Sequence, residues 1–291
     1  MIIHPLAIVS PEAEIGKDVT IGPFAVIESD VVIEEGCRIA AHAVIKEGTT
    51  LGPNNEVGEA AILGGHPQHL KKPEQLGRLV IGAHNIIREH ATLHRSMKPG
   101  EATIVGDRNL LMAGAHVAHD CRVGNRVVLA NNALLAGHVI VEDSAFLSGA
   151  VGVHQFCRIG ALAMIGGLAR VVQDVPPYVL IDGISGCVVG LNLVGLRRNG
   201  YTTEQVAELK RAYRMIYRRG TKWSEILEAL KNEFAEGPAT AFHQFLSSGK
   251  RGFVQERRLP PGATIKLRSQ AEEKSDESQF TTAPELWTKA G

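Results

Sequence analysis

The chain has 291 residues, with 31 basic and 31 acidic side chains and only 5% aromatic residues. This balance of charge excludes the strongly basic footprint of a nucleic-acid-binding protein, and no apolar run approaches the roughly 20 residues needed to span a bilayer. Residues 1–5 lack the basic and apolar segments of a secretory signal, so we expect a cytoplasmic protein without a membrane span.

A six-residue repeat dominates the sequence from residue 3 to residue 171. The aliphatic residues that mark it are Ile3, Val9, Ile15, Ile21, Ile27, Ile33, Ile39, Ile45, Leu51, Val57, Leu63, Ile81, Ile87, Leu93, Val105, Leu111, Val117, Val123, Leu129, Leu135, Val141, Leu147, Val153, Ile159, Ile165 and Val171. A small residue usually stands four positions later, as at Ala25 and Ala43. Because a period of six is neither helical nor a simple strand alternation, the chain must turn a corner after each short extended segment. The repeat predicts a hexapeptide β-solenoid in which both positions point inward.

Glycine and cysteine take defined places in this repeat. Glycine often follows the aliphatic residue directly, as at Gly16 and Gly22, where we expect it to supply backbone freedom at a corner. Cys37, Cys121 and Cys157 occupy the small inward position. They are therefore predicted to be buried thiols rather than disulfide partners or metal ligands.

Two interruptions of the repeat, near residues 64–80 and 94–104, predict loops that leave the solenoid. Loops on a rigid scaffold usually carry recognition, and a solvated excursion is the alternative for the first loop. Together with the repeat the two loops make up a predicted β-helix domain, residues 1–190. A helical domain is expected over residues 191–258. The remainder, residues 259–291, is rich in Pro, Ser, Glu and Lys and is expected to be a mobile tail.

The helical domain shows apolar residues at helical spacing. Thr203 is expected to cap a first helix whose apolar stripe includes Leu209 and Tyr213. A second helix is predicted over residues 224–234 and a third over residues 239–246.

Histidines are concentrated in the middle of the repeat. Since three hexads make one coil of about 18 residues, His119 is followed one coil later by Gly137 and His138, and two coils later by His154 and Gln155. None of these histidines occupies an inward position. Their rings are therefore expected to project from the solenoid.

The pattern favours a general base over a metal site. His116 and His119 are three residues apart, and residues so spaced in an extended segment face opposite sides, which disfavours a shared ion. Asp120 beside His119 can orient the ring and support the imidazolium that forms, and Gly137 would present a backbone N–H to an oxyanion. Solvated histidines without a catalytic role are the alternative.

The sequence around these histidines is specific beyond the generic repeat. It comprises residues 109–112, 116–121, 123–126, 129–133, 135–139, 153–157 and 173–179. In these motifs, and over about residues 1 to 255, the chain resembles the UDP-N-acetylglucosamine O-acyltransferases of lipid A biosynthesis. The resemblance implies an all-β left-handed parallel β-helix with a C-terminal helical domain, assembled as a homotrimer with active sites between subunits. Left-handedness rests on the resemblance alone, because parallel crossovers are generally right-handed.

The resemblance also implies residue roles. His119 is expected to deprotonate the glucosamine 3-hydroxyl for attack on an acyl carrier protein thioester, with Asp120 as its orienting partner and Gly137 as the oxyanion donor. The residues expected to bind the UDP-sugar and acyl groups are Gln68, His69, Lys71, His116, His138, His154, Gln155, Asn192 and Arg198. Gly167 is expected to leave room for a long acyl chain. No metal and no organic cofactor is implied.

A basic cluster in the helical domain is expected to contact the acidic carrier protein. Its members are Arg211, Arg214, Arg218, Arg219 and Lys222. A solvated helix face is an equally good interpretation of these charges.

The chain departs from the family at three substrate-binding positions. His69 stands in place of an aspartate, Val194 in place of a glutamate, and Asn199 in place of an arginine. Transfer to a 3-amino UDP-sugar is therefore an alternative, as is a related N-acyltransferase or acetyltransferase of the hexapeptide family. A non-enzymatic scaffold is disfavoured by the intact set of His119, Asp120 and Gly137.

Overall fold

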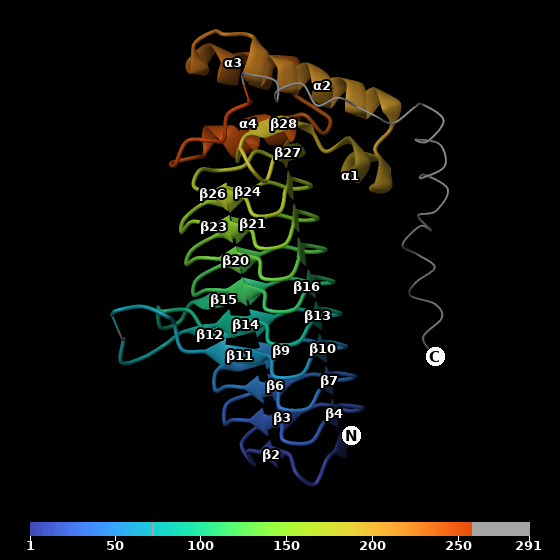
Figure 1. Ribbon diagram of the computed structural model, residues 1–291, viewed down its shortest axis with the longest axis vertical. Helices are drawn as coiled ribbons and strands as arrows, with labels where there is room; N and C mark the ends of the chain where they lie inside the picture. Colours follow the sequence, from blue (N-terminus) through green and yellow to red (C-terminus); the bar gives the residue numbers. More distant parts are fainter. Residues whose placement is uncertain (72, 258–291) are drawn as a thin grey trace. The chain divides into compact units, whose positions relative to one another are not determined.

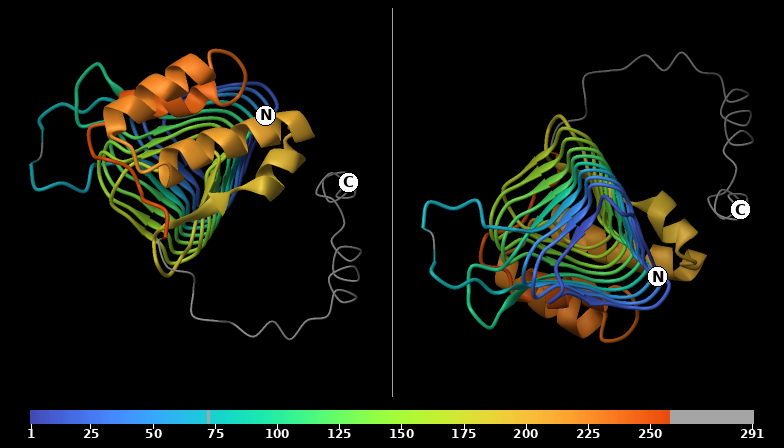
Figure 2. Two further views of the ribbon diagram at one scale, coloured as in Figure 1. Left: turned by 90° about the horizontal axis from the view of Figure 1, so that it is seen from above. Right: turned by 90° about the horizontal axis from the view of Figure 1, so that it is seen from below.

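The computed structural model describes residues 1–71 and 73–257. The predicted tail, residues 259–291, lies outside these described residues, and the predicted boundary between residues 190 and 191 stays a prediction. Residues 1–257 form one compact unit. Seen from its ends, this unit is a three-sided prism of short stacked strands (Figure 2).

Three mainly parallel sheets form the sides of the prism (Figure 1). Sheet A contains β1 (Ile2–Ile3), β4 (Thr20–Ile21), β7 (Arg38–Ile39), β10 (Glu56–Val57), β13 (Ile86–Ile87), β16 (Leu110–Leu111), β19 (Val128–Leu129), β22 (Phe146–Leu147), β25 (Met164–Ile165), β27 (Val179–Ile181) and the antiparallel β28 (Val188–Leu191). Sheet B contains β2 (Ile8–Val9), β5 (Val26–Ile27), β8 (Val44–Ile45), β11 (Ile62–Gly65), β14 (Thr92–His94), β17 (His116–Val117), β20 (Leu134–Leu135), β23 (Gly152–Val153) and β26 (Arg170–Val171). Sheet C contains β3 (Glu14–Ile15), β6 (Val32–Ile33), β9 (Thr49–Leu51), β12 (Arg78–Ile81), β15 (Ala102–Val105), β18 (Arg122–Val123), β21 (Ile140–Val141) and β24 (Arg158–Ile159). The repeat predicted the solenoid and the family resemblance predicted its hand, and the architecture is the expected left-handed parallel β-helix.

The predicted inward positions form the core. From Ile21 onward, every aliphatic residue of the repeat is at most 3% exposed. The three cysteines at small positions are completely buried, as predicted, because each replaces an alanine in the same column.

The glycines after the aliphatic residues have a different role from the one expected. The left-handed backbone conformation falls two residues later, on residues such as Asp18 (φ 55°) and Phe24 (φ 59°). A Cβ on Gly16 would instead lie 2.7 Å from the backbone nitrogen of Glu35 in the next coil. Close stacking of coils, rather than backbone freedom, therefore requires glycine at this position.

Two loops leave the prism, one between β11 and β12 and one between β14 and β15. They project side by side (Figure 2). Each returns to the register of the repeat, since Ile81 pairs with Leu51 after the first loop and Val105 pairs with Val123 after the second. The loops therefore add chain without changing which residues face inward.

Four helices follow the prism within the described residues: α1 (Leu193–Arg198), α2 (Thr203–Arg218), α3 (Trp223–Glu233) and α4 (Thr240–Ser247). The sequence predicted the last three but not the short α1. The predicted cap at Thr203 is wrong, because Thr202 caps α2 in a capping box with Gln205. Within the described part of the chain, no helix is long and apolar enough to cross a membrane.

Arg158 ties the helices to the last coils. Its Nε donates to Asp174 Oδ2 at 2.8 Å, and a terminal nitrogen donates to the Phe245 carbonyl of α4 at 2.8 Å. The guanidinium also lies 4.2 Å from the centre of the Phe245 ring.

Candidate functional site

The predicted catalytic residues lie at the corner between sheets B and C. His119 and Asp120 follow β17 in the turn toward β18. Asp120 adopts the left-handed conformation (φ 61°), and its backbone N–H donates to Thr103 Oγ1 at 2.8 Å. The turn therefore directs two adjacent side chains to one side of the corner.

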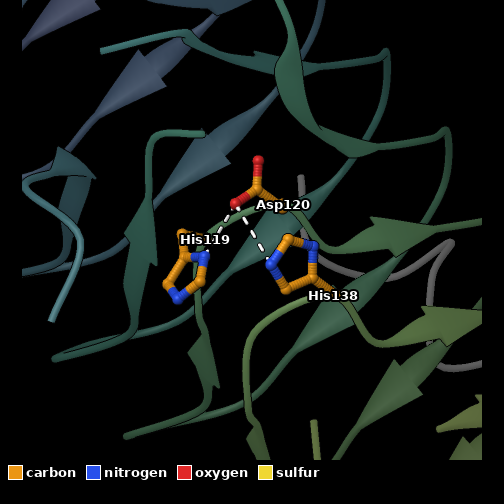
Figure 3. Close-up of side chains that lie close together, drawn as sticks. All are labelled: His119, Asp120 and His138. Carbon is orange, nitrogen blue, oxygen red and sulfur yellow. Dashed lines mark hydrogen bonds and ion pairs between the residues drawn. The ribbon is translucent and has the colours of Figure 1, made fainter. Parts of the chain in front are cut away.

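His119, Asp120 and His138 converge in this corner (Figure 3). His119 Nδ1 lies 2.7 Å from Asp120 Oδ2, and His138 Nε2 lies 3.7 Å from the same oxygen. His138 stands one coil above His119, to whose carbonyl its backbone N–H donates at 3.0 Å, and its ring stacks on Phe156 at 4.6 Å. The His119 side chain is only 10% exposed.

Asp120 is held as a carboxylate. Burial raises its pKa, but hydrogen bonds from Ser96, His119 and the backbone N–H of Met97 outweigh this effect and keep the pKa below its usual value. An ionised Asp120 accepts the Nδ1 proton of His119. The Nε2 of His119 is then the nitrogen that can take a proton.

Gly137 lies directly against the His119 ring. A Cβ at residue 137 would be 2.6 Å from His119 Cε1. The Gly137 N–H has no hydrogen-bond acceptor among the described residues. At another corner of the prism, the equivalent N–H groups of Ala83 and Asp107 do donate, each to a side chain of the next coil. The geometry leaves one backbone donor open beside His119.

A groove of about 500 Å³ runs across the face of sheet B next to this corner. It is lined by Gln68, Thr92, Gly114, His116, Leu134, Leu135, Ala136, Gly152 and Val153. His116 Nδ1 bonds the hydroxyl of Thr92 at 2.8 Å. The mixture of apolar and few polar groups suits a ligand with an apolar chain.

His94 belongs to the same region, although the interrupted repeat marked it only as the start of a loop. Its Nδ1 lies 2.6 Å from the His66 carbonyl and must donate to it, so Nε2 is an acceptor. That Nε2 is buried and has no hydrogen-bond partner in the described residues. Its neighbour His116 was among the predicted site residues. His94 was missed because the second loop makes this coil longer than the 18 residues that the repeat predicts.

His94 and His116 are both neutral at physiological pH. Burial lowers the pKa of His94. Burial and the adjacent His94 lower the pKa of His116 to about 4. Their rings lie 5.0 Å apart, so one positive charge would disfavour a second.

The other predicted substrate residues divide into two groups. His69, on the first loop, points its ring toward His119 at 5.7 Å and accepts the backbone N–H of Lys71 at 3.0 Å. His154 and Gln155 are exposed at the same corner as His119, two coils away. The structure therefore brings these residues to the groove or its edge.

Asn192 and Arg198 lie away from the groove, at the two ends of α1. The Asn192 side chain caps α1 and donates to the Leu162 carbonyl at 2.9 Å, at the corner between sheets C and A. Arg198 is exposed at the end of α1. Within one chain, neither residue shares an edge of the prism with His119. Val194 and Asn199, two of the three departures, belong to this same short helix or its end.

Gly167 lies at the third corner, between sheets A and B. A Cβ there would lie 3.4 Å from the Gly149 carbonyl oxygen and 3.9 Å from Ser148 Cβ, both of which are ordinary contacts. An added side chain would therefore find room at this position, and the role of Gly167 in acyl-chain length stays a prediction.

Four of the five basic residues surround a hollow of about 360 Å³, lined by Arg211, Arg214, Met215, Arg218, Arg219 and Glu233. Arg218 also pairs with Glu256 at 2.8 Å. Lys222 stands apart, at the start of α3.

One arrangement resembles a metal site. Ligand atoms of His119, Asp120 and His138 all lie within 4.8 Å of one another. The 2.7 Å contact between His119 and Asp120 is a direct hydrogen bond, however, and an ion would have to replace its proton. The geometry suits proton transfer better than metal coordination.

Comparison with known proteins gives concordant matches. Residues 174–254 match a family described as UDP-N-acetylglucosamine O-acyltransferase, domain 2, and residues 12–47 and 102–137 match bacterial transferase hexapeptide repeats. Curated relatives include the acyl-(acyl-carrier-protein)–UDP-N-acetylglucosamine O-acyltransferases of Alkalilimnicola ehrlichii, 48% identical, and Burkholderia orbicola, 44% identical. Each alignment covers 87% of this chain and 99% of the relative.

Solved structures agree with these matches. The UDP-N-acetylglucosamine acyltransferase of Francisella novicida superposes with a TM-score of 0.85 at 36% identity, covering 88% of this chain and 95% of the other. The UDP-N-acetylglucosamine O-acyltransferase of Moraxella catarrhalis gives 0.84 at 37% identity, covering 88% and 100%.

Proposed function

The chain belongs to the family of acyl-(acyl-carrier-protein)–UDP-N-acetylglucosamine O-acyltransferases, and we propose that His119 is the general base of its reaction. The enzyme transfers a 3-hydroxyacyl chain from acyl carrier protein to UDP-N-acetylglucosamine in the biosynthesis of lipid A. The observation that carries the proposal is the His119–Asp120 hydrogen bond of 2.7 Å beside the open N–H of Gly137.

The proposed reaction needs no covalent enzyme intermediate. His119 Nε2 takes the proton of the sugar 3-hydroxyl as its oxygen attacks the thioester carbonyl carbon. The Gly137 N–H stabilises the tetrahedral oxyanion, and Asp120 pairs with the imidazolium. The carbon–sulfur bond then breaks, and the carrier thiolate takes the proton from His119 Nε2 as the ester forms. Burial raises the pKa of the Cys121 thiol to about 12, so it is a poor nucleophile.

The proposed active form is a homotrimer with sites between subunits. Asn192 and Arg198 lie on a different edge of the prism from His119, so one chain cannot direct both sets at one substrate. Sheet B also presents Ile8 (67% exposed), Ile62 (37%) and Leu134 (48%) to the outside, and a neighbouring copy would cover them. We further propose that the hollow formed by Arg211, Arg214, Arg218 and Arg219 receives the acidic carrier protein.

Replacement of the base tests this function. His119→Ala is expected to lower kcat by about 10² to 10⁴-fold without unfolding the protein, because it removes a proton acceptor from outside the aliphatic core. His4→Ala, an exposed histidine at the far end of the prism, is the matched control. Retention of more than about a tenth of activity, on the scale of a catalytic base, would overturn the assignment.

The His69 departure makes a second sugar acceptor worth testing. It lies near His119 where an aspartate is expected, and a neutral imidazole offers one donor and one acceptor instead of two acceptor oxygens. Transfer to a 3-amino UDP-sugar would use the same base and oxyanion donor. Parallel kinetics with the 3-hydroxyl and 3-amino forms, with products identified by mass spectrometry, distinguish the two: we expect a higher kcat/KM for the hydroxyl form.

A further inference from the structure

Ser96 is a buried polar residue without a role in the proposed reaction steps. It follows β14 at the start of the second loop and is completely buried. Its backbone N–H donates to the Arg78 carbonyl at 3.2 Å, and its carbonyl accepts the Gly77 N–H at 3.0 Å. These bonds fasten the second loop to the end of the first, so the position of the Ser96 side chain is fixed by the backbone.

The hydroxyl proton of Ser96 has one good acceptor. Ser96 Oγ accepts the backbone N–H of Lys98 at 3.0 Å, so its own proton is free to donate elsewhere. Asp120 Oδ1 lies 2.5 Å away, whereas the Lys98 carbonyl lies 3.4 Å away. The short distance to an ionised oxygen identifies Asp120 as the acceptor.

The two oxygens of Asp120 thereby accept from different donors. Oδ1 accepts Ser96, whereas Oδ2 accepts His119 Nδ1 at 2.7 Å and the backbone N–H of Met97 at 3.4 Å. We propose that Ser96 is a positioning residue that fixes the plane of the Asp120 carboxylate, so that Oδ2 faces His119. This inference rests on the proposed role of His119 as base.

The role predicts a particular kinetic defect. In Ser96→Ala, Asp120 Oδ1 loses its hydrogen-bond donor, while the Asp120 side chain, which is 5% exposed, stays buried. The carboxylate then rotates toward other donors, and His119 loses its orientation. Ser96 does not line the groove. Substrate binding should therefore be affected much less than turnover.

The experiment is a double-mutant cycle with steady-state kinetics. Ser96→Ala is expected to lower kcat about tenfold while KM changes less than about twofold. In an Asp120→Ala background the same change should lower kcat less than about twofold, because the carboxylate on which Ser96 acts is absent. Ser144→Ala is the control, since it removes a hydroxyl that accepts from Arg126 at a different corner. Thermal unfolding checks that each variant is folded.

Two outcomes would overturn the role of Ser96. One is an unchanged kcat in Ser96→Ala, and the other is an equal loss in the wild-type and Asp120→Ala backgrounds, which would indicate a general effect on the loop. Failure of the proposed function gives a different result. In that case His119→Ala itself remains active, whereas failure of this inference alone leaves His119→Ala inactive.

Discussion

Gly137→Ala isolates the dependence of turnover on the position of the His119 ring. The new Cβ would lie 2.6 Å from His119 Cε1 and 2.7 Å from Nε2, and ordinary contact begins at 3.4 Å. The ring must therefore retreat by about 0.8 Å. Because Nδ1 is bonded to Asp120 at 2.7 Å, the ring cannot move without weakening that bond.

The expected cost falls on catalysis and not on folding. A displacement of about 1 Å can lower the rate about 10²-fold, which corresponds to roughly 2.7 kcal/mol in the barrier. Gly137 does not have a left-handed φ, so alanine is not strained there, and the reduced entropy of the unfolded chain offsets part of any clash. Alanine also keeps the backbone N–H, so a loss of turnover reports the displaced ring and not the proposed oxyanion donor.

The assay is kcat/KM together with the midpoint of thermal unfolding. Gly149→Ala is the matched control, because Gly149 occupies the same turn position at another corner and its Cβ would meet nothing nearer than the Asn131 carbonyl at 3.5 Å. We expect the control to keep activity within about twofold. Wild-type turnover in Gly137→Ala, or an equal loss in Gly149→Ala, would refute the reasoning.

Three further predictions concern acyl length, the carrier protein and pH. Gly167→Met fills open space at the corner between sheets A and B, and products from mixed acyl thioesters should shift to shorter chains; unchanged selectivity contradicts this. Arg214→Glu reverses a charge beside the hollow on α2 and should raise KM for acyl carrier protein about tenfold, but not for acyl-pantetheine; Lys17→Glu, in the prism, is the control, and equal effects on both substrates argue against docking there. The pKa of His116 is about 4 in the folded protein and near 6.5 when unfolded, so the unfolded state binds more protons between these values and stability falls as pH drops from about 6.5 to 4. His116→Gln should reduce the total loss of unfolding free energy between these pH values by about 1 to 2 kcal/mol, less than the full linkage because the group is partly solvated; an unchanged pH dependence of the unfolding free energy would show that His116 is not responsible.

The periodic part of the molecule could be predicted from sequence because each position of the hexad has a single environment. The same counting brought Gly137 and His138 to the coil above His119. Residues outside the period escaped it. Ser96 and His94 lie where the second loop begins. The contact of Ser96 with Asp120 depends on how that loop folds back, and the contact of His94 with His66 depends on the path of the first loop.

The helical segment shows a similar limit. The long α2 and α3 have clear apolar stripes, whereas α1 has only six residues and is defined by the Asn192 cap and contacts with the prism. Asn192 was predicted from family resemblance as a substrate residue, and its two side-chain hydrogen bonds to this chain became visible only in the structure.

Because both loops return to the hexad register, the length and sequence of the loops can vary while the stacking of the coils stays fixed. A change in loop length alters the closure entropy by only about 0.6 kcal/mol for each doubling, and it leaves the strand pairing of Ile81 and Val105 untouched. The first loop carries Gln68 and His69, while His119 and Gly137 belong to the coils. Sequence divergence can thus change the residues that the first loop presents, such as His69, while the proposed base His119 and the proposed oxyanion donor Gly137 keep their places in the coils.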